Sequence, residues 1–346
     1  MNEENYITGN AKVLRSINRA MILNIIRTKQ PLPRAEIAKI TGLNKSTVSS
    51  IVADLLQEEL VYEQIKSDQN VGRNPVDLYL RKRKNLVGAI NIDIVMTRFA
   101  LVDIDGSLIG TSAILTEPGD PEKFIGYCLS EMKILCAKKG IKHLAGLGIS
   151  VAGIVDSRNC TVNFAPNLGW ENFHIGEVIK NKWPGINILA VGNDAKSSAL
   201  AELWFGTHDI NPSNYVFVSI GPGIGAGIVV DNKLLEGEFQ ASGEFGHITI
   251  IEGGELCSCG NHGCWEQYAS DRAIVKRYIS RAGSEGKLVP DKDLFVDDII
   301  ELANNNDTVA LDVLRQTGYY LGLGITNIIR SIDPHAIVLG GKITQV

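Results

Sequence analysis

The chain has 346 residues, of which 45% are hydrophobic and 21% are charged, a composition that is ordinary for a soluble globular protein of two or three domains. No apolar stretch reaches the ~20 residues that span a membrane, and the polar start, with Glu3 and Glu4, is not that of a signal peptide. The net charge of −5 hides an asymmetry, because residues 1–84 hold 14 Lys/Arg against 9 Asp/Glu. A basic head on an acidic remainder favours a small DNA-binding module attached to a larger domain.

Three helices are predicted in the first sixty residues. Leu14, Ile17, Met21 and Ile25 recur at helical spacing and predict a helix over residues 12–28. Residues 34–41 predict a second helix, which Gly42 ends. After a short turn, the third helix buries one face, because its apolar residues follow the i, i+3, i+4 pattern: Val48, Ile51, Val52, Leu55 and Leu56.

Short polar side chains and one lysine gather at the start of the third helix, where they can approach base edges and phosphates. Two apolar stretches follow, Leu60–Tyr62 and Val76–Leu80, around a polar loop typical of a β-wing that enters a minor groove. A small helical bundle with a polar N-cap is the alternative, but the wing and the local charge favour a winged helix-turn-helix. The predicted DNA-binding residues are Arg34, Asn44, Lys45, Ser46, Thr47, Ser49, Ser50 and Arg73.

Two segments in the rest of the chain resemble each other. Leu86–Ile109 and Tyr215–Leu235 each contain a β-branched strand, a loop, a second strand and a turn. Two such copies predict two α/β lobes that face a cleft. The loop Gly221–Gly227 suits close approach by a phosphate, with tight hairpin packing as the alternative. The predicted boundaries are 1–80 for the winged helix, 81–85 for a solvated basic linker, 86–205 for the first lobe and 206–346 for the second.

A cluster of cysteines is the strongest chemical signal. Cys257, Cys259 and Cys264 fall within eight residues, and His247 precedes them. Such clustering favours a metal site in a reducing cytoplasm over a disulfide framework. Three thiolates and an imidazole can supply a closed tetrahedral set for structural Zn²⁺. His262 is a rival ligand inside the loop, and buried cysteines without a metal are the alternative.

Three motifs together resemble the ROK family of repressors and sugar kinases, and its xylose-repressor branch most of all. They are the helix-turn-helix segment Gly42–Ser50, the segment Glu244–His247 and the Cys-x-Cys-Gly-x-x-Gly-Cys-x-Glu loop at Cys257–Glu266. The resemblance extends over essentially the whole chain. It implies an α/β protein in which a winged helix-turn-helix precedes a two-lobed, actin-like (ribonuclease-H-like) domain of the sugar-kinase type, with a structural zinc. Because members of the family continue with further helices, we expect the second lobe to be incomplete at its C-terminus.

The resemblance also implies which residues meet the sugar in the cleft. Carboxylates, amides and an imidazole exchange directional hydrogen bonds with sugar hydroxyls. His247 would both ligate zinc and touch the sugar, so the metal would shape the pocket from beneath. The implied sugar-binding residues are Asn193, Asp194, Glu244, His247 and Glu266, and, from less specific motifs, Gly153 and Asn167.

Kinase activity is not expected, although Asp194 matches the catalytic base of the family's kinases. Those kinases hold ATP with an Asp-x-Gly-Gly-Thr loop, which reads Asp93-Ile94-Val95-Met96-Thr97 here. The side chains of Val95 and Met96 would project where phosphate oxygens meet backbone amides, and Pro222 removes a donor from the second loop. Phosphoryl transfer depends mostly on positioning and charge stabilisation of the phosphates, so we predict that the protein is not an enzyme.

The predicted function is a cytoplasmic, sugar-responsive transcriptional repressor that binds a pseudo-palindromic operator as a homodimer or higher oligomer. D-Xylose or a related aldose is the expected effector, and the resemblance suggests that it releases DNA. Such an effector acts only through differential affinity for the DNA-competent and DNA-incompetent states. The alternatives are an ATP-dependent sugar kinase with a regulatory DNA-binding domain and a sugar sensor that acts through protein partners.

Overall fold

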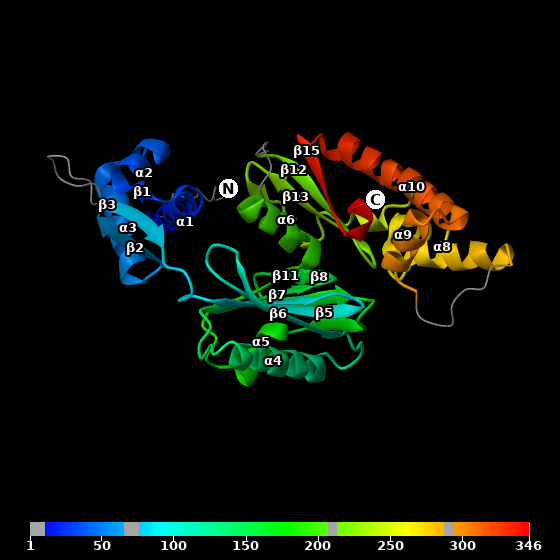
Figure 1. The fold of residues 1–346 in the computed structure, drawn as a ribbon, viewed down its shortest axis with the longest axis horizontal. Helices are drawn as coiled ribbons and strands as arrows, with labels where there is room; N and C mark the ends of the chain where they lie inside the picture. The colour runs from blue at the N-terminus through cyan, green and yellow to red at the C-terminus, as the bar shows by residue number, and fades with distance from the viewer. Residues whose placement is uncertain (1–10, 66–75, 207–212, 287–293, 346) are drawn as a thin grey trace, which may run out of the picture. The chain divides into compact units, whose positions relative to one another are not determined.

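The computed structural model describes residues 11–65, 76–206, 213–286 and 294–345 (Figure 1). The chain forms two compact units. The first contains residues 1–89, 100–111 and 135–146, and the second contains 90–99, 112–134 and 147–346. Residues 100–111 and 135–146 therefore group with the N-terminal residues, and the predicted domain boundaries stay predictions. Among the described residues, no helix is long and apolar enough to cross a membrane.

The N-terminal head is a winged helix-turn-helix, as predicted. Its core is a buried apolar cluster to which all three helices contribute, including the fully buried Ile22 and Ile26 of α1 and Ile51 of α3. Leu14 and Ile17, which define the predicted helix, are more than half exposed, so the buried stripe of α1 lies on its neighbouring face. The elements are α1 (Ala11–Lys29), β1 (Leu32–Pro33), α2 (Arg34–Thr41), α3 (Lys45–Gln57), β2 (Val61–Ile65) and β3 (Val76–Leu80), with the strands in the order β1-β3-β2.

The turn between α2 and α3 has a local explanation. Gly42 ends α2 in the left-handed region, at φ 69°, which glycine adopts without steric cost. Asn44 caps α3, because its side-chain oxygen accepts the backbone N–H of Thr47 at 2.7 Å. The turn therefore fixes where α3 begins.

The basic linker is held by specific contacts, which the prediction of a solvated linker did not include. Lys82 Nζ lies 2.6 Å from Asp105 Oδ2, and the backbone N–H of Arg83 donates to Asp103 at 2.8 Å. Lys84 pairs with Glu59. The run of cations is therefore stabilised by carboxylates in its own compact unit.

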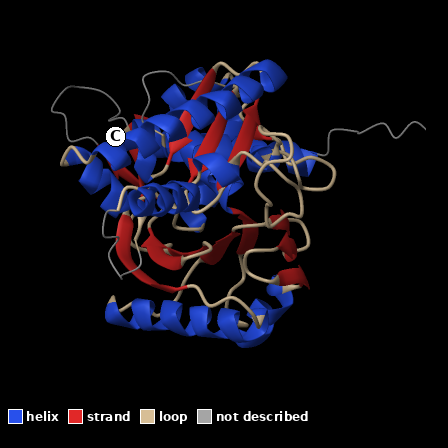
Figure 2. Ribbon diagram, turned by 90° about the vertical axis from the view of Figure 1, so that its right-hand side faces the viewer, coloured by secondary structure: helices blue, strands red, loops and turns tan. Residues whose placement is uncertain are grey.

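The first lobe is built on a five-stranded sheet in the order β11-β7-β4-β5-β6, in which β11 and β7 are parallel. Helix α4 lies along one face of this sheet (Figures 1 and 2). A smaller antiparallel sheet, β10-β9-β8, follows β7. The elements are β4 (Val87–Ile92), β5 (Met96–Val102), β6 (Leu108–Leu115), α4 (Pro121–Lys138), β7 (Gly146–Val151), β8 (Ile154–Asp156), β9 (Thr161–Ala165), β10 (Trp170–Phe173), α5 (Ile175–Lys182), β11 (Leu189–Asn193) and α6 (Asp194–Phe205).

The second lobe has a four-stranded sheet in the order β14-β13-β12-β15, with β12 parallel to β15 and antiparallel to β13. The repeated strand–loop–strand segments thus form β4–β5 in one lobe and β12–β13 in the other. The remaining helices gather around a second apolar cluster. The elements are β12 (Tyr215–Ile220), β13 (Ile224–Val230), β14 (Lys233–Leu234), the 3₁₀ turn η1 (Phe245–His247), α7 (Glu266–Ala269), α8 (Asp271–Ser284), α9 (Val296–Asn304), α10 (Thr308–Ile332), β15 (Ala336–Gly340) and η2 (Lys342–Gln345).

Helices cover both faces of this second sheet (Figure 2). Ile224, Ala226 and Ile228 of β13 pack with Trp265 and Ile328 on one face. On the other face, a Cβ at Gly225 or Gly227 would lie 2.7 or 2.4 Å from alanine side chains of α6. These two glycines therefore allow α6 to pack closely on β13.

Candidate functional site

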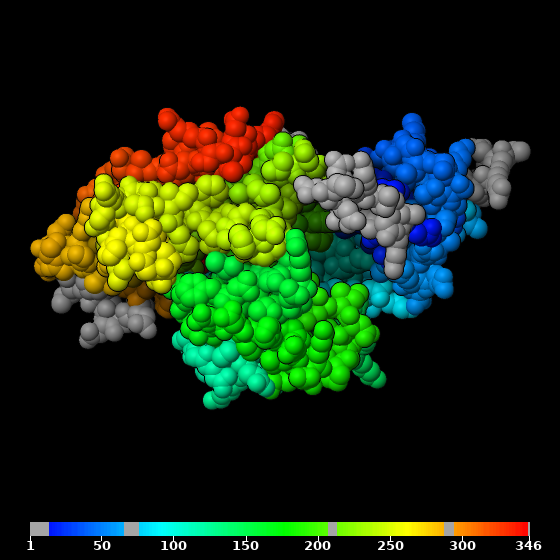
Figure 3. All heavy atoms as spheres, turned by 180° about the vertical axis from the view of Figure 1, so that it is seen from behind, coloured from blue at the N-terminus to red at the C-terminus, as the bar shows by residue number. Residues whose placement is uncertain are grey.

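A pocket of about 110 Å³ in the second unit gathers all seven residues that the sequence assigned to sugar. The first lobe contributes residues from the ends of β4, β7 and β11 and from the β9–β10 turn. The second lobe contributes the β12–β13 loop, η1 and the start of α7. Figure 3 shows the segments of the two lobes, green and yellow, lying against each other. The lining residues are Asp93, Ile94, Ala152, Gly153, Pro166, Asn167, Asn193, Asp194, Ser219, Gly221–Ala226, Glu244, His247 and Glu266.

The junction between β11 and α6 places Asn193 and Asp194 in the pocket. Asn193 caps α6 by accepting the backbone N–H of Lys196 at 2.9 Å, and its amide nitrogen donates to the Gly153 carbonyl at 3.0 Å. A Cβ on Gly153 would lie 2.7 Å from Ala165, so only glycine allows this approach. Asn193 and Gly153 therefore hold the pocket together, and Asp194 is presented at a helix N-terminus.

Two carboxyl groups in the pocket, those of Asp194 and Glu244, have raised pKa values. Burial raises the pKa of Asp194 to about 7, and the charges of Asp93 and Glu244 act in the same direction. Burial also raises the pKa of Glu244, while His247 and Lys196 oppose the shift. Groups of this kind accept hydrogen bonds from hydroxyls, and a protonated Asp194 also donates one.

Lys196 supports this arrangement from below and was not predicted from the sequence. It is 6% exposed, and its ammonium donates to the carbonyls of Glu236 and Gln240 at 3.2 and 2.7 Å. Burial lowers its pKa, which the charge of Glu244 opposes. Lys196 thereby ties α6, which carries Asp194, to the loop that ends at Glu244.

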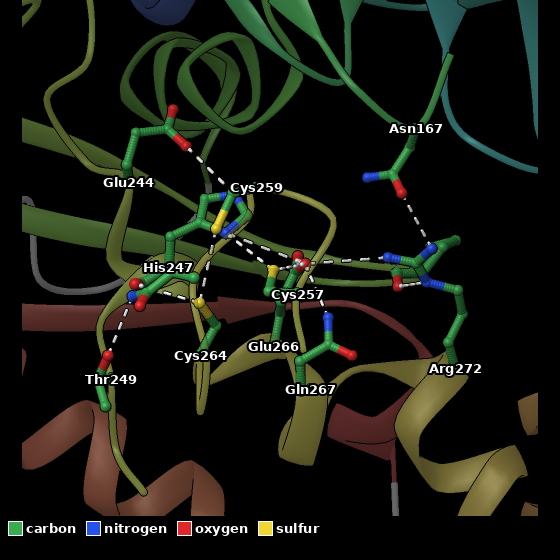
Figure 4. A network of polar contacts seen from close by, with 12 residues as sticks. Asn167, Glu244, His247, Thr249, Cys257, Cys259, Cys264, Glu266, Gln267 and Arg272 are labelled. Atoms are coloured by element: carbon green, nitrogen blue, oxygen red, sulfur yellow. Dashed lines mark hydrogen bonds and ion pairs between the residues drawn. The ribbon is translucent and has the colours of Figure 1, made fainter. Parts of the chain in front are cut away.

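The cysteine loop folds back beneath the pocket (Figure 4). The ligand atoms of His247, Cys257, Cys259 and Cys264 all lie within 4.8 Å of one another. Two of the separations are 3.7 Å between Cys259 Sγ and Cys264 Sγ and 3.5 Å between Cys257 Sγ and His247 Nδ1. Metal–ligand bonds of roughly 2.0–2.3 Å around a tetrahedral Zn²⁺ would give edges of about 3.5–3.8 Å. The four side chains therefore form a group that could hold a metal ion.

His262, the rival ligand, points elsewhere. Its Nδ1 lies 3.0 Å from the carbonyl oxygen of Gly254, and its backbone N–H donates to Asn261. The tight loop also needs Gly263, whose φ is 72° and whose Cβ would lie 1.7 Å from the carbonyl oxygen of Ile251. The loop therefore turns His262 outward and the three cysteines toward His247.

Arg272, at the start of α8, contacts three residues of the pocket lining and was missed by sequence reasoning. Its Nη1 donates to Asn167 Oδ1 at 3.2 Å, and its Nε donates to the Pro222 carbonyl at 2.6 Å (Figure 4). Its Nη2 lies 4.0 Å from Glu266 Oε1. Arg272 thus lies beside the pocket at the Asn167–Glu266 end, away from Glu244, and its contacts with Asn167 and Pro222 join the two lobes.

Comparison with known proteins identifies the family. The model of the ROK family matches residues 87–346, and that of the MarR family matches residues 16–69. The chain belongs to the ROK family. It is 35% identical to the xylose repressor of Bacillus spizizenii over 96% of this chain and 84% of that protein.

Two solved ROK structures resemble the chain. A transcriptional regulator described as a homolog of the Escherichia coli MLC protein has a TM-score of 0.79 and 27% identity, and covers 96% of this chain and 84% of its own. A glucokinase from Streptomyces griseus in complex with glucose and AMPPNP has a TM-score of 0.67 and 29% identity. The match covers 75% of this chain and 84% of the glucokinase. Of these ROK proteins, the regulators therefore match the head as well as the lobes.

The segment Asp93–Thr97, which leads from β4 into β5, is anchored by two threonines. Thr97 is fully buried, and its hydroxyl lies 2.9 Å from that of Thr116. Thr116 also donates to the carbonyl of Asp93 and, through its backbone N–H, to that of Val95. The segment Asp93–Val95 is therefore fixed from β6, with Asp93 and Ile94 at the pocket wall.

The predicted DNA-binding residues of this ROK protein divide into free and engaged side chains. Lys45 and Ser46 are exposed at the start of α3, where the Ser46 hydroxyl donates to Asn44 Oδ1 at 2.8 Å. Arg34 pairs with Glu63 of β2 at 2.7 Å, and Ser50 accepts a hydrogen bond from Arg15 of α1 at 3.0 Å. Asn44 is the α3 cap, and Thr47 and Ser49 are half-buried. Arg73 lies outside the described residues.

Proposed function

We propose that this ROK protein is a transcriptional repressor whose affinity for DNA is controlled by a sugar bound in the pocket between its two lobes. The observation that carries the proposal is the joining of a winged helix-turn-helix to a pocket that gathers all seven residues implied for sugar. A kinase would need the pocket alone, whereas a regulator needs both parts. The best-supported effector is D-xylose or a related neutral aldose, because the similar repressor is named for xylose.

Structural Zn²⁺ is the metal that best fits the four ligand atoms, which are three thiols and one imidazole. It would supply a closed tetrahedral crosslink rather than hydrolytic chemistry. His247 presents Nδ1 to the thiols and Nε2 toward Glu244, at 3.9 Å from Oε2. If a metal bound Nδ1, Nε2 would carry the proton and face the pocket as a donor.

We also propose that the protein is not an enzyme, because two of its loops differ from those expected to bind phosphate. Val95 and Met96 stand where ROK kinases have glycines, and Pro222 replaces a donor in the second loop. Asp194 then remains as a hydrogen-bond partner of sugar rather than as a base. Mixing the protein with ATP and D-xylose or D-glucose tests this, and the release of ADP at a sugar-dependent rate would support the kinase alternative.

The operator is proposed to be a pseudo-palindrome bound by a homodimer, with α3 of each copy in a major groove. Lys45 is exposed where it can contact DNA, and the N-terminal amides of α3 attract phosphate. Sugar binding would shift the population between DNA-competent and DNA-incompetent states, in the direction that releases DNA.

Fluorescence anisotropy tests the proposal with labelled DNA from upstream of the chain's own gene, titrated with salt and with a panel of sugars. We expect tight, salt-sensitive binding that one aldose weakens without ATP. Specific binding that no sugar alters would contradict the sugar response. Only non-specific binding, also on DNA selected from a random pool, would favour a sensor that acts through protein partners.

A further inference from the structure

The polar groups around the pocket are unequally distributed between acceptors and donors. Asp93, Asp194, Glu244 and Glu266 are carboxyl groups, whereas sugar hydroxyls both donate and accept. Carboxylates alone would leave the hydroxyl oxygens of a sugar without donors, which costs affinity once water is excluded, so the donors among the polar groups matter. Arg272 is the cation that adds donors at the Asn167–Glu266 end.

The contact with Arg272 also fixes which atom of the Asn167 side-chain amide faces the pocket. A guanidinium only donates hydrogen bonds, so the Asn167 oxygen must face it, at 3.2 Å. Figure 4 shows the amide nitrogen turned away from Arg272, toward the Glu244 side. Because the Pro222 carbonyl holds Nε at 2.6 Å, the guanidinium plane cannot turn freely. Asn167 therefore presents its donor to the pocket.

From this geometry, and on the basis of the proposed function, we propose that Arg272 is a specificity-determining residue for the sugar. It orients Asn167 and offers its own N–H groups to one hydroxyl of a neutral aldose, while Glu244 and Asp194 accept from hydroxyls at the other end. An aldose that lacks a hydroxyl at the Asn167–Glu266 end would leave these donors unpaired and bind more weakly.

The test measures binding of D-xylose, D-glucose and their monodeoxy derivatives by calorimetry to the wild-type chain and to Arg272→Met and Asn167→Asp. Asn167→Asp keeps the contact with Arg272 but replaces the donor by an acceptor. We expect each variant to bind the effector at least tenfold more weakly, and the double variant to show strong non-additivity. One deoxy sugar should lose no affinity on Arg272→Met, which identifies the contacted hydroxyl.

A merely structural role would weaken every sugar alike, so equal losses for the whole series would overturn the proposal, as would unchanged affinity in both variants. Arg272→Lys keeps the charge but not the fork of donors, and should recover only part of the affinity. A wild-type chain that binds none of these sugars would overturn the proposed function itself.

An independent set of contacts bears on how the pocket communicates with DNA. Strand β5 begins directly after the pocket segment Asp93–Val95 and ends at the turn Asp103–Ser107, which contacts the head. Ile104 packs against the apolar core of the head, and Asp105 pairs with Lys82 at 2.6 Å. Asp103, 4% exposed, accepts the backbone N–H of Arg83 at 2.8 Å. One strand thus leads from the pocket wall to the linker of the DNA-binding head.

We infer that the turn Asp103–Ser107 carries the sugar signal to the head. Burial alone would raise the pKa of Asp105, but hydrogen bonds from Lys82 and Ser107 lower it to about 2, so the carboxylate stays ionised at neutral pH. A shift of β5 on sugar binding must therefore either carry the linker along or break a charged, partly buried contact. Each alternative changes the free energy of the DNA-competent state.

The coupling is the ratio of the DNA dissociation constants with saturating sugar and without it, measured by anisotropy. In the wild type we expect a ratio of at least ten, and in Asp105→Lys and Ile104→Ser a ratio near one, with the affinity for sugar in the absence of DNA unchanged. The double reversal Lys82→Asp/Asp105→Lys should restore the ratio. If both single variants kept the wild-type ratio, the inference would be wrong; a ratio of one in the wild type would instead contradict the proposed function.

Discussion

His247 Nε2 lies 3.9 Å from Glu244 Oε2, while Nδ1 of the same ring lies 3.5 Å from Cys257 Sγ. One imidazole therefore faces the cysteine cluster with one nitrogen and the pocket with the other. The histidine and the glutamate sit at the two ends of η1, a single turn, so their separation is fixed locally. The sugar response should consequently depend on the metal.

Metal removal is therefore expected to abolish the sugar response. Chelation, or Cys259→Ser, releases the Nδ1 side of His247, so the ring can rotate and Nε2 is no longer a fixed donor. Affinity for the aldose should fall at least tenfold in calorimetry. DNA binding without sugar should persist, because the head has its own apolar core. Equal loss of sugar and DNA binding on chelation would indicate general unfolding instead.

A buried carboxyl makes stability depend on pH. The pKa of Asp194 is about 7 in the folded chain and about 4 in an unfolded one. Between these values only the folded state holds the proton, so the contribution of Asp194 to the free energy of unfolding is lost as pH rises from about 4 to 7. Urea unfolding should thus show that Asp194→Asn stabilises the lobes more at pH 8 than at pH 5.

The control for this prediction is Asp120→Asn, an exposed carboxylate before α4. It should change the free energy of unfolding about equally at the two pH values. A stabilisation by Asp194→Asn that is the same at pH 5 and pH 8 would contradict the raised pKa of Asp194.

The recognition helix gives a prediction about salt dependence. Lys45 is exposed at the first position of α3, where a phosphate contact is available. Lys45→Ala should weaken binding to operator and to random DNA alike and reduce the slope of log K against log salt by about one. Lys123→Ala, the same charge change at an exposed site of α4, should alter neither quantity. An unchanged slope for Lys45→Ala would place the phosphate contacts elsewhere.

The winged helix and the repeated strands follow from local patterns, since turn residues and motifs act over short distances. The seven pocket residues proposed for sugar came from the resemblance to the ROK family instead. The packing side of α1 does not follow, because the helix carries two apolar stripes and only the fold selects Ile22 and Ile26 over Leu14 and Ile17. Periodicity identifies a helix, but the face that it buries depends on its partners.

The sequence analysis also missed two residues whose hydrogen-bond partners lie far away in the chain. Arg272 meets Asn167 only because two lobes close on one another, and no local pattern connects the two positions. Lys196 resembles an ordinary solvated helix lysine in the sequence, yet the fold buries it. The partners of Arg272 and Lys196 can be identified only from the three-dimensional structure, which places loops of one lobe against elements of the other.

Close packing between β13 and α6 provides the last prediction. A Cβ at Gly227 would lie 2.4 Å from the Ala199 side chain and 2.9 Å from the carbonyl oxygen of Ala195, so α6 must move away. Because α6 begins at Asp194, the shift reaches the pocket directly. Gly227→Ala should destabilise the lobes by about 1–3 kcal/mol in urea unfolding and weaken aldose binding, since overpacking displaces well-packed elements.

Gly221→Ala is the matched control, because its Cβ meets no atom within 4 Å, although it lies in the same glycine-rich stretch. If the stretch served phosphate approach alone, the two substitutions would have similar effects on stability. If β13 is glycine-rich for packing against α6, only Gly227→Ala destabilises the lobes. Ala199→Gly, combined with Gly227→Ala, removes the clashing methyl group and should recover part of the lost sugar affinity, at the cost of about 0.5–1 kcal/mol for glycine within a helix.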